Sequence, residues 1–197
     1  MMDMVALPQM RYRGWLRIED FVMLQNAGSF AEAGKTELIE GEIFRVNAQF
    51  VRHAYAKSML HLAIDRGLRA IDSSLVVLVE ASVAMPPFDM PEPDLVITEK
   101  PSQGGPLSFN GVALIVEVAD TTQKFDLGRK AFVYARSRIP EYWVVDLTDN
   151  VIVRHWAPGE AGYGESDRVT VGEAVGSMTI AALVVATGEL TGLPDKD

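Results

Sequence analysis

The sequence predicts one mixed α/β or α+β domain. Three observations support this fold class: segments with apolar residues at helical spacing, short β-branched and apolar runs, and the alternation of the two along the chain. A chain of 197 residues, 48% of them hydrophobic, is long enough to bury one sizeable core. We therefore expect one domain over residues 15–190, with short tails at 1–14 and 191–197.

The first expected elements are a helix and a hairpin. Residues 15–27 place apolar side chains at helical spacing. Residues 35–46 contain two short apolar runs on either side of Glu40 and Gly41, and glycine supplies the positive φ that a tight turn needs. This pattern predicts two antiparallel strands joined at that dipeptide.

Residues 51–69 are the longest helical candidate, and two sets of side chains mark two of its faces. The set expected to form the apolar face recurs at i, i+4 and i+7 and consists of Tyr55, Met59 and Leu62. The other set consists of His53, Lys57 and His61. These three side chains could contact phosphates, but such a set is more often a solvated helix face.

The rest of the chain predicts short strands around one further helix. In chain order, we expect a strand at 75–84, a loop entering a strand at 91–98, a central strand at 112–118, a helix at 126–137, and paired strands at 141–146 and 151–156. The run at 112–118 is almost continuously apolar, which is typical of a strand covered on both faces. Short strands and turns are expected from Tyr163 to Leu190, where the apolar segment 178–186 belongs either to the core or to a subunit interface.

Composition limits the compartment and the partners. The chain has no cysteine, which excludes a disulfide framework and a thiolate metal site. No apolar run approaches the roughly 20 residues that span a bilayer, and residues 1–10 lack the pattern of a signal peptide. We therefore expect a cytoplasmic protein without a membrane partner. The net charge of −9 argues against a nucleic-acid partner unless basic residues cluster on one face.

Two carboxylates are candidates for chemistry because each lies against a strongly apolar strand. Asp94 opens the run DLVIT, and Glu117 lies near the end of VALIVEV. A carboxylate in a buried strand is costly unless it is paired or bound to a cation. If the two strands are neighbours, both side chains could share one pocket and hold Mg²⁺, which prefers oxygen ligands. The alternative is a solvated strand-entry residue at Asp94 and a simple ion pair at Glu117.

Lys130 is the third candidate. It lies one helical turn after Asp126, so the two side chains share a face. The predicted helix follows the Glu117 strand after a short loop, so this ammonium could turn back toward the carboxylates and neutralise charge on a phosphate. The same spacing also fits an exposed Asp–Lys pair with no further role.

Several of these residues lie in an ordered series of motifs. The series runs ELIEGEI at 37–43, PEPDLVI at 91–97, LIVEV at 114–118, D-x-x-x-K-x-x-x-Y-A at 126–135 and IPEYWVVD at 139–146. Together these motifs resemble the Uma family of restriction-endonuclease-like proteins. The resemblance extends from about Trp15 to beyond Trp156, which is most of the chain.

The resemblance implies a PD-(D/E)XK nuclease core, which is a mixed β-sheet core flanked by helices of the restriction-endonuclease-like type. It also assigns roles to the acids of this chain. Asp94 would be the aspartate of the motif and Glu117 the acid on the next core strand, and both would be metal ligands and catalytic residues. The backbone carbonyl of Val118 would be a further metal ligand. Glu37 would be an accessory catalytic acid, with Glu40 a weaker candidate.

One departure from the superfamily pattern concerns the lysine. That pattern has a lysine two residues after the acid, where this chain has Ala119. The Uma pattern resembles a version in which the lysine has moved to the following helix, which makes Lys130 the catalytic lysine. His53 and Asp126 are accessory candidates, His53 because the family usually has a histidine at the start of its first long helix.

The function implied by the resemblance is a Mg²⁺-dependent endonuclease, with Mn²⁺ as an alternative metal, that hydrolyses phosphodiester bonds in DNA. A homodimer is expected, because a nuclease that cuts both strands often needs two sites. Two alternatives remain open. One is a catalytically silent protein that keeps this fold as a binding or dimerisation module, and the other is a hydrolase for a different phosphoester.

Overall fold

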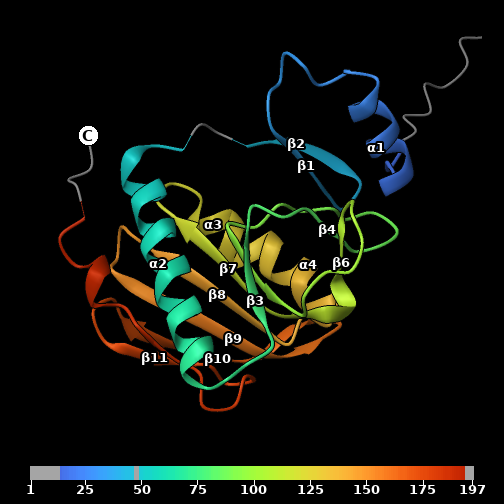
Figure 1. Ribbon diagram of the computed structural model, residues 1–197. Helices are drawn as coiled ribbons and strands as arrows, with labels where there is room; N and C mark the ends of the chain where they lie inside the picture. Colours follow the sequence, from blue (N-terminus) through green and yellow to red (C-terminus); the bar gives the residue numbers. More distant parts are fainter. Residues whose placement is uncertain (1–13, 47–48, 194–197) are drawn as a thin grey trace, which may run out of the picture.

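The computed structural model describes residues 14–46 and 49–193, and a six-stranded sheet forms its centre (Figure 1). In spatial order the strands are β10 (Gly162–Thr170), β9 (Val151–Gly159), β8 (Glu141–Asp146), β7 (Val112–Ala119), β5 (Leu95–Thr98) and β3 (Val76–Val79). Strands β7 and β8 run parallel, and the other neighbouring pairs are antiparallel. The predicted mixed sheet flanked by helices is confirmed.

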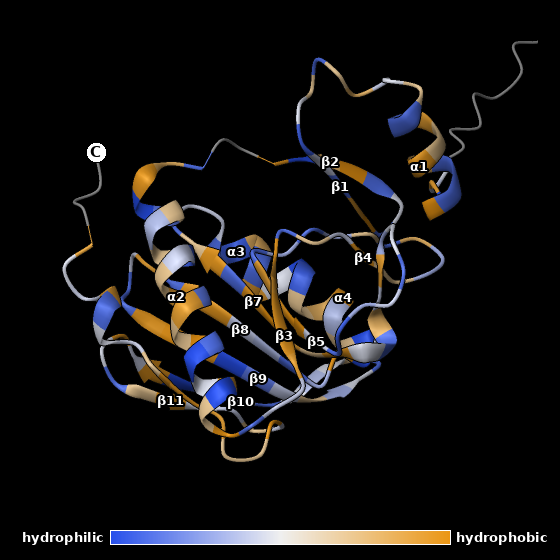
Figure 2. Ribbon diagram, in the orientation of Figure 1, coloured by the Kyte–Doolittle hydropathy of each residue, from blue (hydrophilic) through white to orange (hydrophobic). Residues whose placement is uncertain are grey.

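Alternating side chains of the central strands divide the core between the two faces of the sheet. Leu114 and Val116 of β7 belong to the same apolar cluster as the buried residues of helix α2 (Val51–Ala70). Ile115 belongs instead to the cluster of helix α4 (Ala131–Arg136) on the other face. Figure 2 shows hydrophobic residues along β3 and β5 as well. The apolar run of β7 is therefore explained by its burial on both faces.

The N-terminal part of the described chain forms a helix and a hairpin beside the sheet. These elements are α1 (Ile18–Asn26), β1 (Thr36–Ile39) and β2 (Glu42–Arg45), drawn in blue in Figure 1. The hairpin turns at Glu40 and Gly41, with φ values of 51° and 72°, as expected from the glycine. Leu38 of β1 and Met90 exchange backbone hydrogen bonds of 3.2 and 2.8 Å, which attach the hairpin to the chain leading into β5.

The helix expected at 51–69 is confirmed as α2, but its predicted apolar face is wrong. Tyr55 and Leu62 are 45% and 43% exposed. The buried side is one helical step away and consists of Ala56, Lys57, Leu60, Ile64 and Leu68. Its small residues allow close packing: a Cβ atom on Gly67 would lie 3.0 Å from the carbonyl oxygen of Val184. Packing against neighbouring elements, rather than side-chain size, therefore decides which face is buried.

The strand expected at 75–84 is two strands. Strand β3 ends at Val79, and β4 (Val83–Ala84) pairs in parallel with β6 (Leu107–Ser108). The break lies at Glu80, whose φ of 53° is incompatible with a continuous strand. Its carboxylate pairs with Lys57 and with Lys35, so this backbone conformation accompanies a partly buried ion-pair network that the local sequence does not reveal.

The helix expected at 126–137 starts earlier and is not regular. It comprises α3 (Gln123–Phe125), a π-helical turn over Asp126–Lys130, and α4. After β8 and β9, the C-terminal segment continues through β11 (Ala174–Gly176) and β12 (Val184–Ala186). The 3₁₀ turns lie at Phe109–Gly111 and Gly188–Leu190.

The apolar segment 178–186 belongs largely to the core. Ile180, Leu183 and Val185 are buried in the cluster under α2. Met178 and Val184 remain exposed. Within the ranges that the structure describes, no helix has both the length and the apolar character needed to cross a membrane.

Candidate active site

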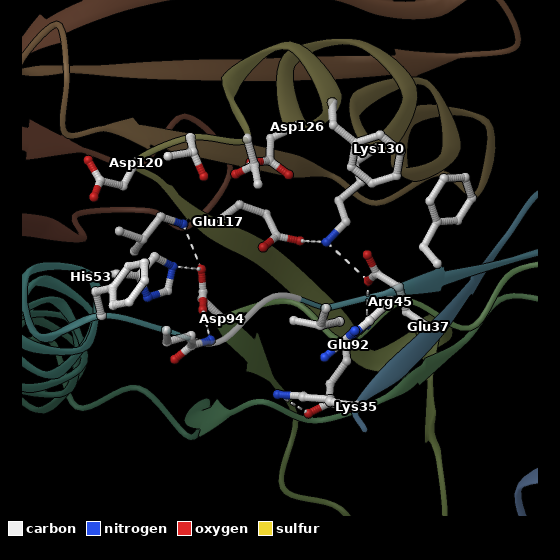
Figure 3. A pocket seen from close by; sticks show the side chains of 18 residues that line it. Lys35, Glu37, Arg45, His53, Glu92, Asp94, Glu117, Asp120, Asp126 and Lys130 are labelled. Carbon is white, nitrogen blue, oxygen red and sulfur yellow. Dashed lines mark hydrogen bonds and ion pairs between the residues drawn. The ribbon is translucent and has the colours of Figure 1, made fainter. Parts of the chain in front are cut away.

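A pocket of about 530 Å³ lies between the N-terminus of α2, the hairpin and the start of α3 (Figure 3). Its lining is rich in charged side chains. The carboxylates are Glu37, Glu92, Asp94, Glu117, Asp120 and Asp126, and the Lys and Arg side chains are Lys35, Arg45 and Lys130. The two candidate acids on neighbouring strands therefore do share one pocket, as β5 and β7 are paired.

Asp94 lies directly before β5, where four groups surround its carboxylate. The backbone N–H of Val118 donates to Oδ2 at 2.8 Å, and His53 Nε2 lies 3.2 Å from the same oxygen. Gln49 Nε2 donates to Oδ1 at 3.3 Å, and Lys57 Nζ lies 3.5 Å from it. Burial raises the pKa of Asp94, but the hydrogen bonds from His53 and Val118 outweigh burial and hold this pKa below its usual value. Asp94 is therefore a carboxylate at neutral pH.

Glu117 faces the α4 side of the sheet. Lys130 Nζ and the hydroxyl of Tyr134 each donate to its Oε1 at 2.9 Å. Burial raises the pKa of Glu117 to about 8; the ammonium of Lys130 opposes this rise, and Asp126 and the other nearby carboxylates add to it. The buried carboxylates on this side of the pocket thus outnumber the one ammonium that they share.

Lys130 bridges two elements that are far apart in sequence. Its ammonium lies 2.9 Å from Glu117 on β7 and 3.1 Å from Oε2 of Glu37 on β1. Figure 3 shows the three side chains pointing toward one another. Burial lowers the pKa of Lys130, but the facing carboxylates, Glu117 first, raise it well above its usual value. The exposed Asp–Lys pair considered from sequence is wrong, because Asp126 and Lys130 are both buried.

The π-helical turn directs Asp126 and Lys130 into the same pocket. π-Helical turns occur frequently at functional sites. The Thr122 hydroxyl donates to Oδ2 of Asp126 at 2.5 Å, which fixes this carboxylate at the start of the turn. Burial raises the pKa of Asp126 to about 6, against the effects of Lys130 and Thr122. Asp126 lies beside the site but makes no hydrogen bond to Glu117 or Asp94 among the residues that the structure describes.

His53 and Lys57 of α2 do not belong to a solvated helix face. His53 lines the pocket, and Lys57 is only 7% exposed. The ammonium of Lys57 contacts Asp94, Glu80 and Gln49. His61, two turns further along, does not line the pocket. The interpretation as a solvated surface is therefore wrong for His53 and Lys57.

Glu40 lies outside the pocket. Its carboxylate pairs with Arg129 at 2.6 Å and with Arg136 at 3.2 Å. The Arg129 guanidinium also lies 4.8 Å from the ring centre of Phe44 on β2. These contacts hold the hairpin, and with it Glu37, against the helix that carries Lys130.

Several residues of the site were missed from sequence. Tyr134 stands one turn after Lys130 within the D-x-x-x-K-x-x-x-Y-A motif, and this spacing was an available signal. Lys35 pairs with Glu80 at 2.9 Å and with Glu92 at 2.6 Å, and no local pattern marks this network. Its members come from separate segments, which only the tertiary fold brings together.

The mixed sheet, with carboxylates of adjacent strands in one pocket, agrees with the restriction-endonuclease-like core that the sequence resemblance implies. Residues 18–185 match the family Uma2, described as "Putative restriction endonuclease". The chain belongs to this family. The match confirms the resemblance seen in the sequence motifs.

A solved structure has the same fold. It is described as a "putative nuclease belonging to DUF820" from Anabaena variabilis, and it superposes with a TM-score of 0.68 at 13% sequence identity. The alignment covers 89% of this chain and 97% of that chain. The comparison with curated proteins gives no significant match. At this level of identity the structural similarity supports the fold alone.

Proposed function

We propose that the chain is a Mg²⁺-dependent endonuclease, active with Mn²⁺ as well, that hydrolyses phosphodiester bonds in DNA. One observation carries this proposal: Asp94 and Glu117, on neighbouring strands, line one pocket, and Lys130 is held 2.9 Å from Glu117. The membership of the Uma2 family supports the same reaction class.

The residues of the pocket fit a hard divalent cation. Asp94 and Glu117 would supply carboxylate oxygens. The N–H of Val118 donates to Asp94, directly before β5. In a β-strand the N–H and C=O of one residue face the same edge, so the Val118 carbonyl would also face the start of β5. Among the described residues no group of three or more His, Asp and Glu side chains is placed to hold one ion. This donor set would leave positions for water, as Mg²⁺ usually requires.

A Mg²⁺ ion bound here would lower the pKa of a coordinated water and polarise the phosphate. In the hydrolysis, the water oxygen forms a new bond to phosphorus and gives up a proton, the bond from phosphorus to one ester oxygen breaks, and that oxygen takes a proton as it leaves, so that the proton count balances. Lys130 would hold a positive charge beside Glu117 and the developing negative charge on the phosphate. Asp94 stays ionised and fixed in direction by Val118 and His53.

Cleavage of a DNA substrate with Asp94→Asn and Glu117→Gln tests the proposal. Each variant should lose activity on the order of 100-fold, because each replaces a carboxyl group that would ligate the cation with a neutral amide. Calorimetric titration with Mn²⁺ should show weaker binding in the same variants. Glu165→Gln, an exposed change on β10, is the matched control and should behave as the wild type. Full activity of either pocket variant would contradict the assignment.

A catalytically silent binding or dimerisation module is the second candidate. It is favoured by one feature of the pocket: both oxygens of Asp94 already have protein partners. A wild-type protein that binds neither Mg²⁺ nor Mn²⁺ at millimolar concentration would favour the module over the nuclease. Sedimentation velocity would then show whether the chain forms the homodimer expected from sequence.

A further inference from the structure

The rim of the pocket has an arginine that the metal-centred chemistry does not use. Arg45, at the end of β2, lines the pocket and is exposed to solvent. Lys35 and Lys130 are each paired with two carboxylates. Arg45 forms an ion pair with none of the carboxylates in residues 14–46 and 49–193. Its guanidinium is therefore available for an anion that enters from outside.

The N-terminus of α2 opens onto the same rim. Phe50 is the N-cap residue and offers no side-chain acceptor, and the first turn contains no acidic residue. The first backbone N–H groups of a helix lack intrahelical partners and carry the positive end of its dipole. Phe50 and His53 of this turn both line the pocket. An anion at the rim would therefore meet these donors as well as Arg45.

Phe50 itself presents an aromatic ring to solvent. It is 75% exposed although it lines a pocket whose interior is charged. An exposed aromatic side chain next to cationic groups is the usual platform on which proteins stack an unpaired base, and every base can stack in this way.

We propose that this rim is a binding subsite for an unpaired strand of DNA. A phosphate adjacent to the cleaved one contacts Arg45 and the N-terminus of α2, and its base stacks on Phe50. This inference rests on the proposed nuclease function and adds the substrate class. Bases in a duplex are already stacked on one another, so their faces are closed to Phe50. The net charge of −9 and the pocket volume of about 530 Å³, which is typical of small-ligand sites, also fit one strand better than a duplex.

Fluorescence anisotropy with a labelled oligonucleotide tests the subsite. Binding is measured with Ca²⁺ in place of Mg²⁺, for the single strand and for the duplex of the same sequence. We expect the single strand to bind about ten-fold tighter or more. Phe50→Ala should weaken binding of the single strand by about five-fold or more, and Phe50→Trp should restore it. Because Phe50 is exposed, the thermal midpoint of both variants should equal that of the wild type.

The salt dependence of binding tests the phosphate contact. Arg45→Gln should lower the slope of log K against log salt by about 0.7, the value for one phosphate contact to a single strand. Arg168→Gln removes an exposed arginine from β10, on the far edge of the sheet, and should leave the slope unchanged. Equal slopes in the two variants would overturn the role of Arg45.

The two proposals fail in different ways. Tighter binding of the duplex than of the single strand would overturn the subsite, and Mg²⁺-dependent cleavage of that duplex would still support the nuclease. Binding of the single strand that depends on Phe50 and Arg45, without hydrolysis in any divalent metal, would support the subsite and overturn the nuclease.

Discussion

Glu141 illustrates a buried carboxylate with a structural role. It lies at the start of β8, is fully buried, and accepts hydrogen bonds from the Trp143 indole at 2.6 Å and from the Ser177 and Thr179 hydroxyls at 2.6 and 2.8 Å. The backbone N–H groups of Met178 and Thr179 also donate to it at 3.0 Å. This one side chain therefore fixes the segment that follows β11.

Glu141→Gln should destabilise the fold by about 2–4 kcal/mol. The amide nitrogen of glutamine would face groups that donate hydrogen bonds to the charged carboxylate in the wild type. The midpoint and slope of urea denaturation measure this change in the free energy of unfolding. Glu165→Gln, exposed on β10, should change it by less than about 0.5 kcal/mol. A similar effect in the two variants would contradict the structural role of Glu141.

The ion pairs of Glu80 predict how the stability of the fold changes at acidic pH. The hydrogen bond from Lys57 lowers the pKa of Glu80 to about 2; burial opposes this, and Lys35 adds to it. Because the folded-state pKa lies below the unfolded value of 4.5, the stabilisation is present above pH 4.5 and is lost as the pH falls toward 2. Glu80→Gln should therefore flatten the fall in stability between pH 4.5 and 2, measured by urea denaturation at each pH. Glu189→Gln, at an exposed pair with Arg66, should leave the fall unchanged.

At the residue scale, the sequence predicted which acids could act but not what surrounds them. Asp94 and Glu117 could be recognised because a carboxylate on an apolar strand is unusual, and the pairing of β5 with β7 then brings them together. The burial of Lys57 beside Asp94 could not be recognised. This burial depends on Glu80, which is 23 residues away and reaches it through a left-handed backbone conformation.

At the element scale, the contact between α2 and β12 is close enough to be tested with glycine substitutions. A Cβ atom on Gly67 would lie 2.9 Å from Leu183 and 3.0 Å from the Val184 carbonyl, whereas one on Gly128 would meet no atom within 4 Å. Gly67→Ala should destabilise the protein by about 1–2 kcal/mol, because crowding outweighs the better helix propensity of alanine. Gly128→Ala should be neutral or stabilising by up to about 1 kcal/mol. Thermal denaturation of both variants would measure the difference, and an equal shift would contradict the close contact.

Elements with a strong local signal were predicted well. The bounds of β8 and the turn of the hairpin agree with the sequence, because six consecutive buried residues and a glycine turn are local features. The apolar face predicted for α2 was wrong, and the break at Glu80 was missed. Both features depend on what packs against the element. The π-helical turn was also missed, as its residues D-L-G-R-K satisfy the spacing of an ordinary α-helix.

At the scale of the whole molecule, the excess of carboxylates in the pocket predicts that divalent cations stabilise the fold. A ligand present at about 100 times its dissociation constant stabilises the native state by about 2.7 kcal/mol. For a chain of this size, this corresponds to a rise in thermal midpoint of about 5–10 °C. Mg²⁺ should produce this rise in the wild type and not in Glu117→Gln. NaCl at equal ionic strength is the control, and an equal rise with NaCl would show that screening alone is responsible.

The π-helical turn also has a consequence for chain length. Compared with an α-helix, a π-helical turn accommodates one additional residue. Deleting Gly128 would remove the additional residue and let the segment close as a regular α-helix, so the residues before and after it would keep nearly the same relative orientation. Deleting a residue between Lys130 and Tyr134, in α4, would instead rotate these two side chains by about 100° relative to each other, so that they could no longer both reach Glu117. A one-residue deletion is therefore expected to be tolerated better within residues 126–130 than within residues 131–133.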